Sequence, residues 1–139
     1  MKFTIPGEPQ GKARPRVVRN GNFTRAYTPE KTASYENLVR LEYQSQCGNR
    51  FYDKEIPLAV TITAHFAPPA SASKRKLAAM LDKLLFPMKK PDLDNVAKIV
   101  CDALNGIAYH DDAQIVTLHV RKLYAVMPKV DVEISEVIG

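Results

Sequence analysis

The sequence predicts an α+β fold in which helices pack on one mixed or antiparallel sheet. Segments of alternating or β-branched residues predict strands at 2–6, 58–66, 114–126 and 130–137, with a hairpin at 16–27. Apolar residues at helical spacing predict helices at 28–46, 73–85 and 94–106. A chain of 139 residues fits a single domain, 1–139, with a sizeable core.

The N-terminal part is predicted to form a strand, a basic loop and a hairpin. Phe3 and Ile5 alternate with polar residues in the first strand. The segment GEPQGKARPR follows, and its glycines and prolines predict a loop. Asn20-Gly21-Asn22 predicts the turn of the hairpin.

The first helix has clear start and stop signals. Thr28 is predicted as its N-cap and Pro29 as its first helical residue. Gly48 follows the last apolar residue at helical spacing and is predicted to end the helix.

The second half of the chain contributes the remaining strands and helices. LAVTITAHF, residues 58–66, predicts a strand because it is rich in β-branched and apolar residues. Ser73 is a suitable N-cap for the basic helix, and Asp94 or Asn95 for the next one. The last two strands are predicted to form a hairpin around residues 127–129.

Composition excludes several classes of protein. Hydrophobic residues make up 45% and charged residues 25%, which is ordinary for a soluble domain. No apolar run reaches the roughly 18 residues that span a bilayer, so no membrane partner is expected. The N-terminus has no apolar signal core, which favours a cytoplasmic protein. In that reducing compartment Cys47 and Cys101 are expected to be free thiols.

Charge is distributed unevenly along this chain of net charge +5. Residues 1–31 hold seven basic and two acidic residues, and residues 72–90 hold six and one, so each segment carries +5. Residues 91–112 hold five aspartates and one lysine, a net of −4. This pattern favours a polyanionic partner bound around an acidic centre, although a solvated basic surface would also account for the charge alone.

The aspartates of Asp92-Leu93-Asp94 are predicted to form a metal site. If the backbone stays extended through Asp94, both carboxylates point to one side and Leu93 faces the core. Two adjacent carboxylates repel unless a cation lies between them, and hard oxygen ligands suit Mg²⁺ or Mn²⁺. Lys98, four residues after Asp94, projects near that acid on the following helix.

A second acidic pair, Asp111-Asp112, precedes the next strand. One of these side chains can point back to the first site while the other caps a turn. Aspartates with a lysine are suited to phosphodiester hydrolysis, because metal ions activate water and the lysine stabilises the transition state. The alternative is that all these acids are caps and turn residues. An EF-hand loop does not fit the residues here, and the histidines and cysteines lack zinc-ligand spacing.

Three motifs together carry a specific resemblance. DLDN-x-x-K, DALNG and DD-x-QI occur in order over residues 92–115, and GKARPR with YTPEKTASYE occurs near the N-terminus. In these motifs the chain resembles the RusA family of Holliday junction resolvases of bacteria and their phages. The resemblance implies a RusA-like fold and a homodimeric, Mg²⁺-dependent endonuclease that nicks branched DNA. It implies that Mn²⁺ substitutes for Mg²⁺ and that no organic cofactor is needed.

The resemblance also assigns roles by position. It implies that the catalytic residues are Asp92, Asp94, Lys98 and Asp112, and that the metal ligands are Asp92, Asp94 and Asp112, with Asp111 ranked after them. The basic segments predict DNA phosphate contacts at Lys12, Arg14, Arg16, Lys74, Arg75, Lys76, Lys89 and Lys90.

Several alternatives stay open at the level of sequence. Phe23 and Tyr27 could stack on unpaired bases, although packing within the hairpin is the more common role. A phage-type nuclease that cuts flaps or forks would use the same chemistry as a junction resolvase. A non-catalytic basic DNA-binding module is the alternative from a different class.

Overall fold

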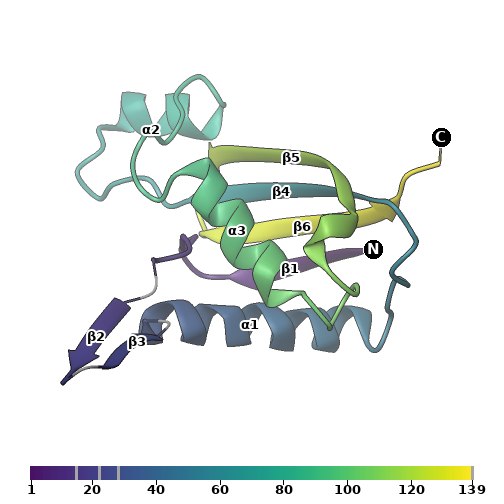
Figure 1. Ribbon diagram of the computed structural model, residues 1–139. Helices are drawn as coiled ribbons and strands as arrows, with labels where there is room; N and C mark the ends of the chain where they lie inside the picture. The colour runs from purple at the N-terminus through teal and green to yellow at the C-terminus, as the bar shows by residue number, and fades with distance from the viewer. Residues whose placement is uncertain (15, 22, 28, 139) are drawn as a thin grey trace.

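The computed structural model describes residues 1–14, 16–21, 23–27 and 29–138, without the side chains of 16, 18, 20 and 23–27. Over these residues it has an α+β fold with one four-stranded mixed sheet and a separate two-stranded ribbon, as predicted (Figure 1). The strands are β1 (Lys2–Pro6), β2 (Arg16–Asn20), β3 (Phe23–Tyr27), β4 (Leu58–Phe66), β5 (Ile115–Tyr124) and β6 (Lys129–Glu136). The helices are α1 (Glu30–Cys47), α2 (Lys74–Leu81) and α3 (Leu93–Ala103), with a short 3-10 turn, η1, at Asp112–Gln114.

The sheet has the strand order β1-β6-β4-β5. The hairpin predicted for the last two strands is wrong, because β4 lies between them, parallel to β5 and antiparallel to β6. The connection from β5 to β6 therefore crosses the end of β4, where the amide of Ala125 donates to the carbonyl of Phe66 at 3.0 Å. The central position suits β4, since it is the strand whose alternate side chains, Leu58 to Phe66, are most completely buried.

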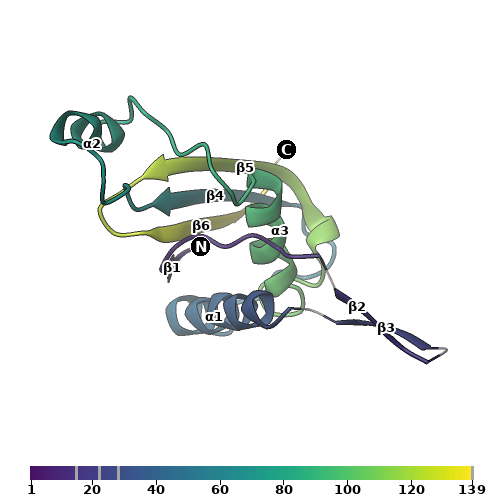
Figure 2. The same cartoon turned by 90° about the vertical axis from the view of Figure 1, so that its left-hand side faces the viewer.

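The core lies between the sheet and helices α1 and α3 (Figures 1 and 2). Val96, Ile99 and Val100 of α3 are fully buried against it, and Val39 and Tyr43 of α1 are buried beside them. Burying each such side chain stabilises the fold by roughly 1.5–3 kcal/mol. This packing fixes the rotation of α3 about its axis, and therefore decides which of its side chains reach solvent.

Helices α1 and α2 each differ from the predictions at one boundary. Helix α1 begins at Glu30 with Pro29 at the N-cap, so the predicted boundary is one residue early; Thr28 lies outside the described residues. Helix α2 begins as predicted, with the Ser73 hydroxyl accepting from the amide of Lys76 at 3.2 Å. It ends at Leu81 and not near Leu85, because the amides of Leu84 and Leu85 both donate to the carbonyl of Ala79 and so leave the helical pattern.

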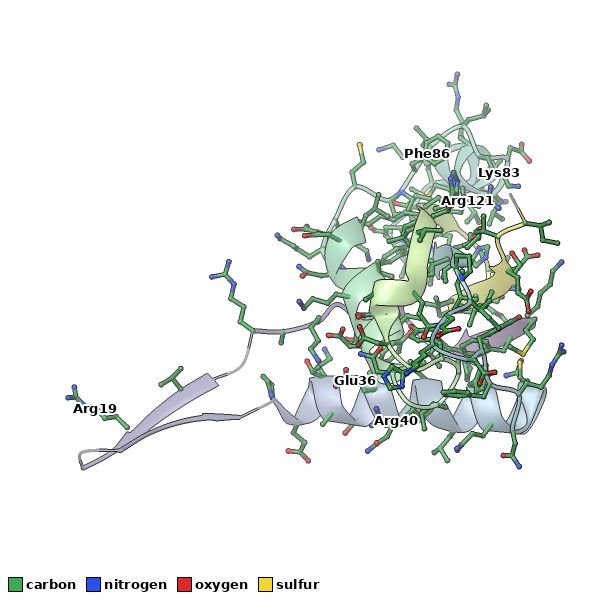
Figure 3. All side chains as sticks on the ribbon, turned by 45° about the vertical axis from the view of Figure 1, so that its right-hand side comes forward. Arg19, Glu36, Arg40, Lys83, Phe86 and Arg121 are labelled. Atoms are coloured by element: carbon green, nitrogen blue, oxygen red, sulfur yellow. The ribbon has the colours of Figure 1, made fainter. Side chains whose placement is uncertain are left out.

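The predicted hairpin at 16–27 is present as the antiparallel pair β2 and β3. It projects away from the sheet and the helices, and Arg19 lies far from the body of the molecule (Figures 1 and 3). Within the described part of the chain, every helix is too short or too polar to cross a membrane.

Candidate active site

Helix α3 begins earlier than the sequence indicated. The amide of Val96 donates to the carbonyl of Asp92 at 3.0 Å, so Asp92 is the N-cap and Leu93 is already helical. The predicted extended stretch through Asp94 is therefore wrong, and Asp92 and Asp94 do not share one extended face. Leu93 was predicted to face the core, but it is 41% exposed. Asp94 lies in the first turn of the helix, where its charge interacts favourably with the helix dipole.

One face of α3 carries the polar residues of the site. Asp94, Lys98 and Asp102 follow one another at four-residue steps, so they lie along one side of the helix. Asp94 and Lys98 line a pocket of about 330 Å³ together with Asp112 from the segment before β5. Two acids from separate segments thus line one pocket, together with a lysine of the helix that carries Asp94.

The second acidic pair divides its roles, as one of the sequence alternatives suggested. The Asp111 side chain caps η1 by accepting from the amide of Ala113 at 3.1 Å, and Gln114 Oε1 accepts from the amide of Asp111 at 3.0 Å. Asp112 instead faces the pocket, and its amide donates to Asn105 Oδ1 at 2.8 Å. Asn105, in the DALNG motif, therefore fixes the backbone from which Asp112 projects.

Asp112 lies in a strongly negative environment. Partial burial raises the pKa of its carboxyl, as do a hydrogen bond with the Asp102 carboxyl and the nearby charge of Asp111. Sequence reasoning did not select Asp102. The available signal was its spacing, because Asp102 lies two four-residue steps after Asp94.

Cys101 also lines this pocket but is a poor nucleophile. Its side chain is buried, and burial raises the pKa of the thiol to about 12. The reactive form of cysteine is the thiolate, so Cys101 stays in its unreactive form at neutral pH.

Lys12 reaches the site from the N-terminal loop. Its Nζ is 2.9 Å from Glu36 Oε2 on α1 and 3.6 Å from Asp102 Oδ2 on α3. Glu36 lies on the side of α1 that faces the rest of the fold (Figure 3) and was not selected from the sequence. The predicted contact of Lys12 with phosphate remains a prediction, but its ammonium points to these carboxylates in the structure.

The same loop forms the wall of a second pocket of about 440 Å³. Lys12, Ala13 and Arg14 lie on one side of it and Asp94 and Lys98 on the other. Because both pockets include Asp94 and Lys98, they adjoin at these two residues. Arg14 is exposed, so its guanidinium is available to an anion that enters this space.

Asp92 lies outside both pockets. It is exposed, and its carboxylate is 3.0 Å from the ammonium of Lys90. Among the described residues, no three or more histidine, cysteine or carboxylate side chains lie close enough together to hold a metal ion. The oxygen donors gathered at the pocket are Asp94 and Asp112, and carboxylate oxygens fit a hard divalent cation such as Mg²⁺.

The other basic residues selected from the sequence lie around the site and on α2. Lys74, Arg75 and Lys76 are exposed in the first turn of α2, so their charges face solvent. Lys89 is exposed, with its Nζ 5.9 Å from the centre of the Phe66 ring. The side chains of Arg16, Phe23 and Tyr27 lie outside the described part of the structure.

Comparisons with known proteins point to one family. A profile of the family described as Endodeoxyribonuclease RusA matches residues 6–135 of the chain. The chain is also 36% identical, over 138 residues, to the uncharacterized protein YqaN of Bacillus subtilis (strain 168). That match covers 99% of this chain and 96% of the relative. Both comparisons extend over nearly the whole chain, including the N-terminal loop, α3 and the segment that carries Asp112.

Proposed function

Because the chain belongs to the RusA family of endodeoxyribonucleases, we propose that it is a Mg²⁺-dependent enzyme that resolves four-way DNA junctions by paired, symmetric nicks. One observation carries this proposal beyond the family: Asp94, Lys98 and Asp112 line a single pocket although Asp112 is distant in the sequence. That pocket adjoins a second one lined by Arg14, so acidic and basic groups meet at one place.

The proposed metal ligands are the carboxylates at the start of α3 and at the segment before β5. Asp94 and Asp112 would hold the ion, and the resemblance adds Asp92 as a third carboxylate. A bound Mg²⁺ would supply the activation of water and the neutralisation of charge on the scissile phosphate. The crowding of Asp102 and Asp111 around Asp112 supports this assignment, because a divalent cation would relieve their repulsion.

The remaining tasks belong to side chains of the chain itself. Lys98 is exposed and one turn from Asp94, so its ammonium is available to stabilise negative charge that develops on the phosphate oxygens. Arg14 would bind a neighbouring phosphate in the adjoining pocket and so orient the strand. Such orientation contributes to the rate because it makes the attack effectively intramolecular.

Binding of the DNA arms would depend on the exposed basic residues away from the pocket. The positive charges on α2 and those of Lys89 and Lys90 precede α3 in the sequence, and the projecting hairpin carries Arg19 (Figure 3). Phosphate contacts of this kind give affinity without sequence preference. The basic contacts would therefore recognise the shape of the branch, and the acidic pocket would cut the strand that the branch presents.

The test is a side-by-side cleavage assay with Mg²⁺ on synthetic four-way, three-way, flap and linear DNA that share the same arm sequences. The proposal predicts cleavage of the four-way junction well above cleavage of linear duplex. Preferential cleavage of flaps would indicate a branched-DNA nuclease and not a junction resolvase. Binding without any cleavage would favour a non-catalytic DNA-binding module.

A further inference from the structure

A row of charged side chains connects the N-terminal loop to the acidic pocket. It runs from Glu36 through Lys12 to Asp102 and ends at Asp112, the acid that lines the pocket. The Lys12 ammonium is 2.9 Å from Glu36 and 3.6 Å from Asp102, and Asp102 lies within hydrogen-bonding reach of Asp112. Lys12 is thus separated from the pocket acid by a single side chain.

The backbone around Lys12 is tied to both helices that flank the site. The amide of Lys12 donates to the carbonyl of Asn95 on α3 at 2.9 Å, and the amide of Ala13 donates to the hydroxyl of Thr32 on α1 at 3.3 Å. At Gly11 the loop passes so close to the start of α3 that a Cβ would lie 2.7 Å from Pro91 Cβ and 3.1 Å from Asn95 Cβ. These contacts fix the place from which the Lys12 side chain extends.

The burial of this charged row distinguishes Lys12 from an exposed lysine that contacts phosphate. The side chains of Lys12, Glu36 and Asp102 are only 17%, 12% and 28% exposed. Ion pairs with this little solvent depend strongly on both partners, because removal of one leaves an uncompensated charge. Without Lys12, the Asp102 carboxylate beside Asp112 would lose its ammonium partner.

We infer that Lys12 is a positioning residue: by binding Asp102 and Glu36 it holds Asp102 in place, and so keeps the Asp112 carboxylate directed into the pocket with Asp94 and Lys98. This inference rests on the proposed function. It adds Lys12 to the residues of the proposed active site, as a residue that acts through Asp102 on Asp112. Lys12 touches neither the pocket acid nor the scissile phosphate in this role. Its removal should therefore lower the rate of the chemical step and leave junction affinity nearly unchanged.

The test compares five variants in single-turnover cleavage and in junction binding. Lys12→Met should lower the cleavage rate by about tenfold to a hundredfold, the range that small misplacements of catalytic groups produce. Junction affinity should change by less than about threefold, since it depends on many other phosphate contacts. Lys12→Arg keeps the charge and should stay within about threefold of the wild-type rate, because an arginine can bind both carboxylates. Lys2→Met is the matched control, because Lys2 is an exposed lysine of β1 that pairs with Glu133 at 4.0 Å and lines neither pocket of the site.

The double variant Lys12→Met/Asp102→Asn separates positioning from a purely structural role. Asp102→Asn removes the negative charge that Lys12 balances and keeps a side chain that can donate a hydrogen bond to Asp112. Asp102→Asn alone should also lower the rate, because it removes the partner through which Lys12 acts, and the loss in the double variant should be smaller than the product of the two single losses. If the loss of rate in Lys12→Met came only from a loosened loop, the two single losses would multiply in the double variant. Should Lys12→Met not fold, Lys12→Gln would take its place in both variants.

An activity-independent measurement keeps this inference separate from the proposed function. The ¹³Cγ resonance of Asp112 at fixed pH should shift in Lys12→Met and stay at its wild-type position in Lys2→Met. If wild-type protein cuts no branched DNA, the proposed function fails and this resonance still decides the inference. The inference is overturned if the resonance does not move, if Lys12→Met cuts at the wild-type rate, or if rate and affinity fall together.

Discussion

At the scale of single residues, the spacing of acids along α3 explains how much of the site could be read from the sequence. Asp94 and Lys98 lie one turn apart on any helix, so their proximity was predictable, as was the division of work between Asp111 and Asp112. The orientation of Asp92 was not, because it depended on whether the helix begins before or after Asp94. Glu36 and Asp102 were missed because their relation to Lys12 is formed only when three separate segments pack together.

The first prediction concerns the role of Asp112. Asp112→Asn preserves the shape of the side chain but removes a charged oxygen ligand from the pocket. Cleavage should fall by at least about a hundredfold, as expected when a group that acts in the transition state is removed. Junction binding, measured by gel shift in Ca²⁺, should persist because it depends on lysines and arginines. A variant that cuts at the wild-type rate would show that Asp112 is not part of the active site.

The second prediction concerns the stability cost of the same residue. The pKa of Asp112 is raised above its ordinary value of 3.8, so the folded state binds this proton more tightly than the unfolded chain does. Ionisation of Asp112 therefore costs stability: the cost is absent below pH 3.8, grows as pH rises through the raised pKa, and is complete above it.

The side chain of Asp112→Asn cannot ionise and so does not carry this cost. In metal-free protein, the free energy of unfolding of the variant minus that of wild type should therefore be larger at pH 8 than at pH 3.5. Urea denaturation at several pH values would measure this difference. Asp53→Asn, at an exposed acid outside the pocket, is the control. A difference that does not grow with pH would contradict the charge repulsion described here.

At the scale of elements, local patterns predicted the strands and helices better than their arrangement. Alternation and capping signals identified β1, the β2–β3 hairpin, β4 and the three helices to within a few residues. The order of strands was not predictable from the same signals, since β5 and β6 are joined by a short connection and yet lie on opposite sides of β4. The burial of β4 between them is a property of the assembled sheet, and no local signal encodes it.

The third prediction concerns the contact between the N-terminal loop and α3. In Gly11→Ala the new methyl group would lie 2.7 Å from Pro91 Cβ and 3.1 Å from Asn95 Cβ, so the loop must move away from the helix. We expect a loss of roughly 1–3 kcal/mol of stability, as for other overpacked positions. Thermal unfolding would measure it, with Gln10→Ala at the neighbouring position as the control. An unchanged melting temperature would show that the loop is not held as closely as the structure indicates.

At the scale of the whole molecule, the distribution of charge follows the proposed task. In a chain of net charge +5, Asp94 and Asp112 line one pocket, while basic residues are exposed on α2 and at Arg19 of the projecting hairpin. This contrast was visible in the sequence, because it depends on composition along the chain and not on packing. The assembly of two chains was implied only by the family resemblance.

The fourth prediction concerns that assembly. Resolution of a four-way junction needs one nick in each of two equivalent strands, and one chain offers one acidic pocket. A two-fold dimer would supply two pockets related by the symmetry of the junction. Sedimentation at micromolar concentration should therefore give a mass of roughly twice the 15.5 kDa of one chain. Two-fold dimers are the commonest assembly among soluble homo-oligomers. On a cruciform plasmid, the two nicks should appear within one binding event as linear DNA. A monomer at all concentrations, with nicked circles that never become linear, would favour a branched-DNA nickase.

The most direct test of a metal-dependent active site is the metal dependence of cleavage by a preformed complex of the protein with a four-way junction. Addition of Mg²⁺ or Mn²⁺ should start cleavage, and excess EDTA should prevent it. Ca²⁺ should leave the complex intact with little product, because its longer and less regular coordination positions the attacking water poorly. Asp112→Asn, assembled on the same junction, should remain uncut in Mg²⁺. Cleavage of the junction at an undiminished rate in excess EDTA would contradict the assignment of Asp94 and Asp112 as metal ligands.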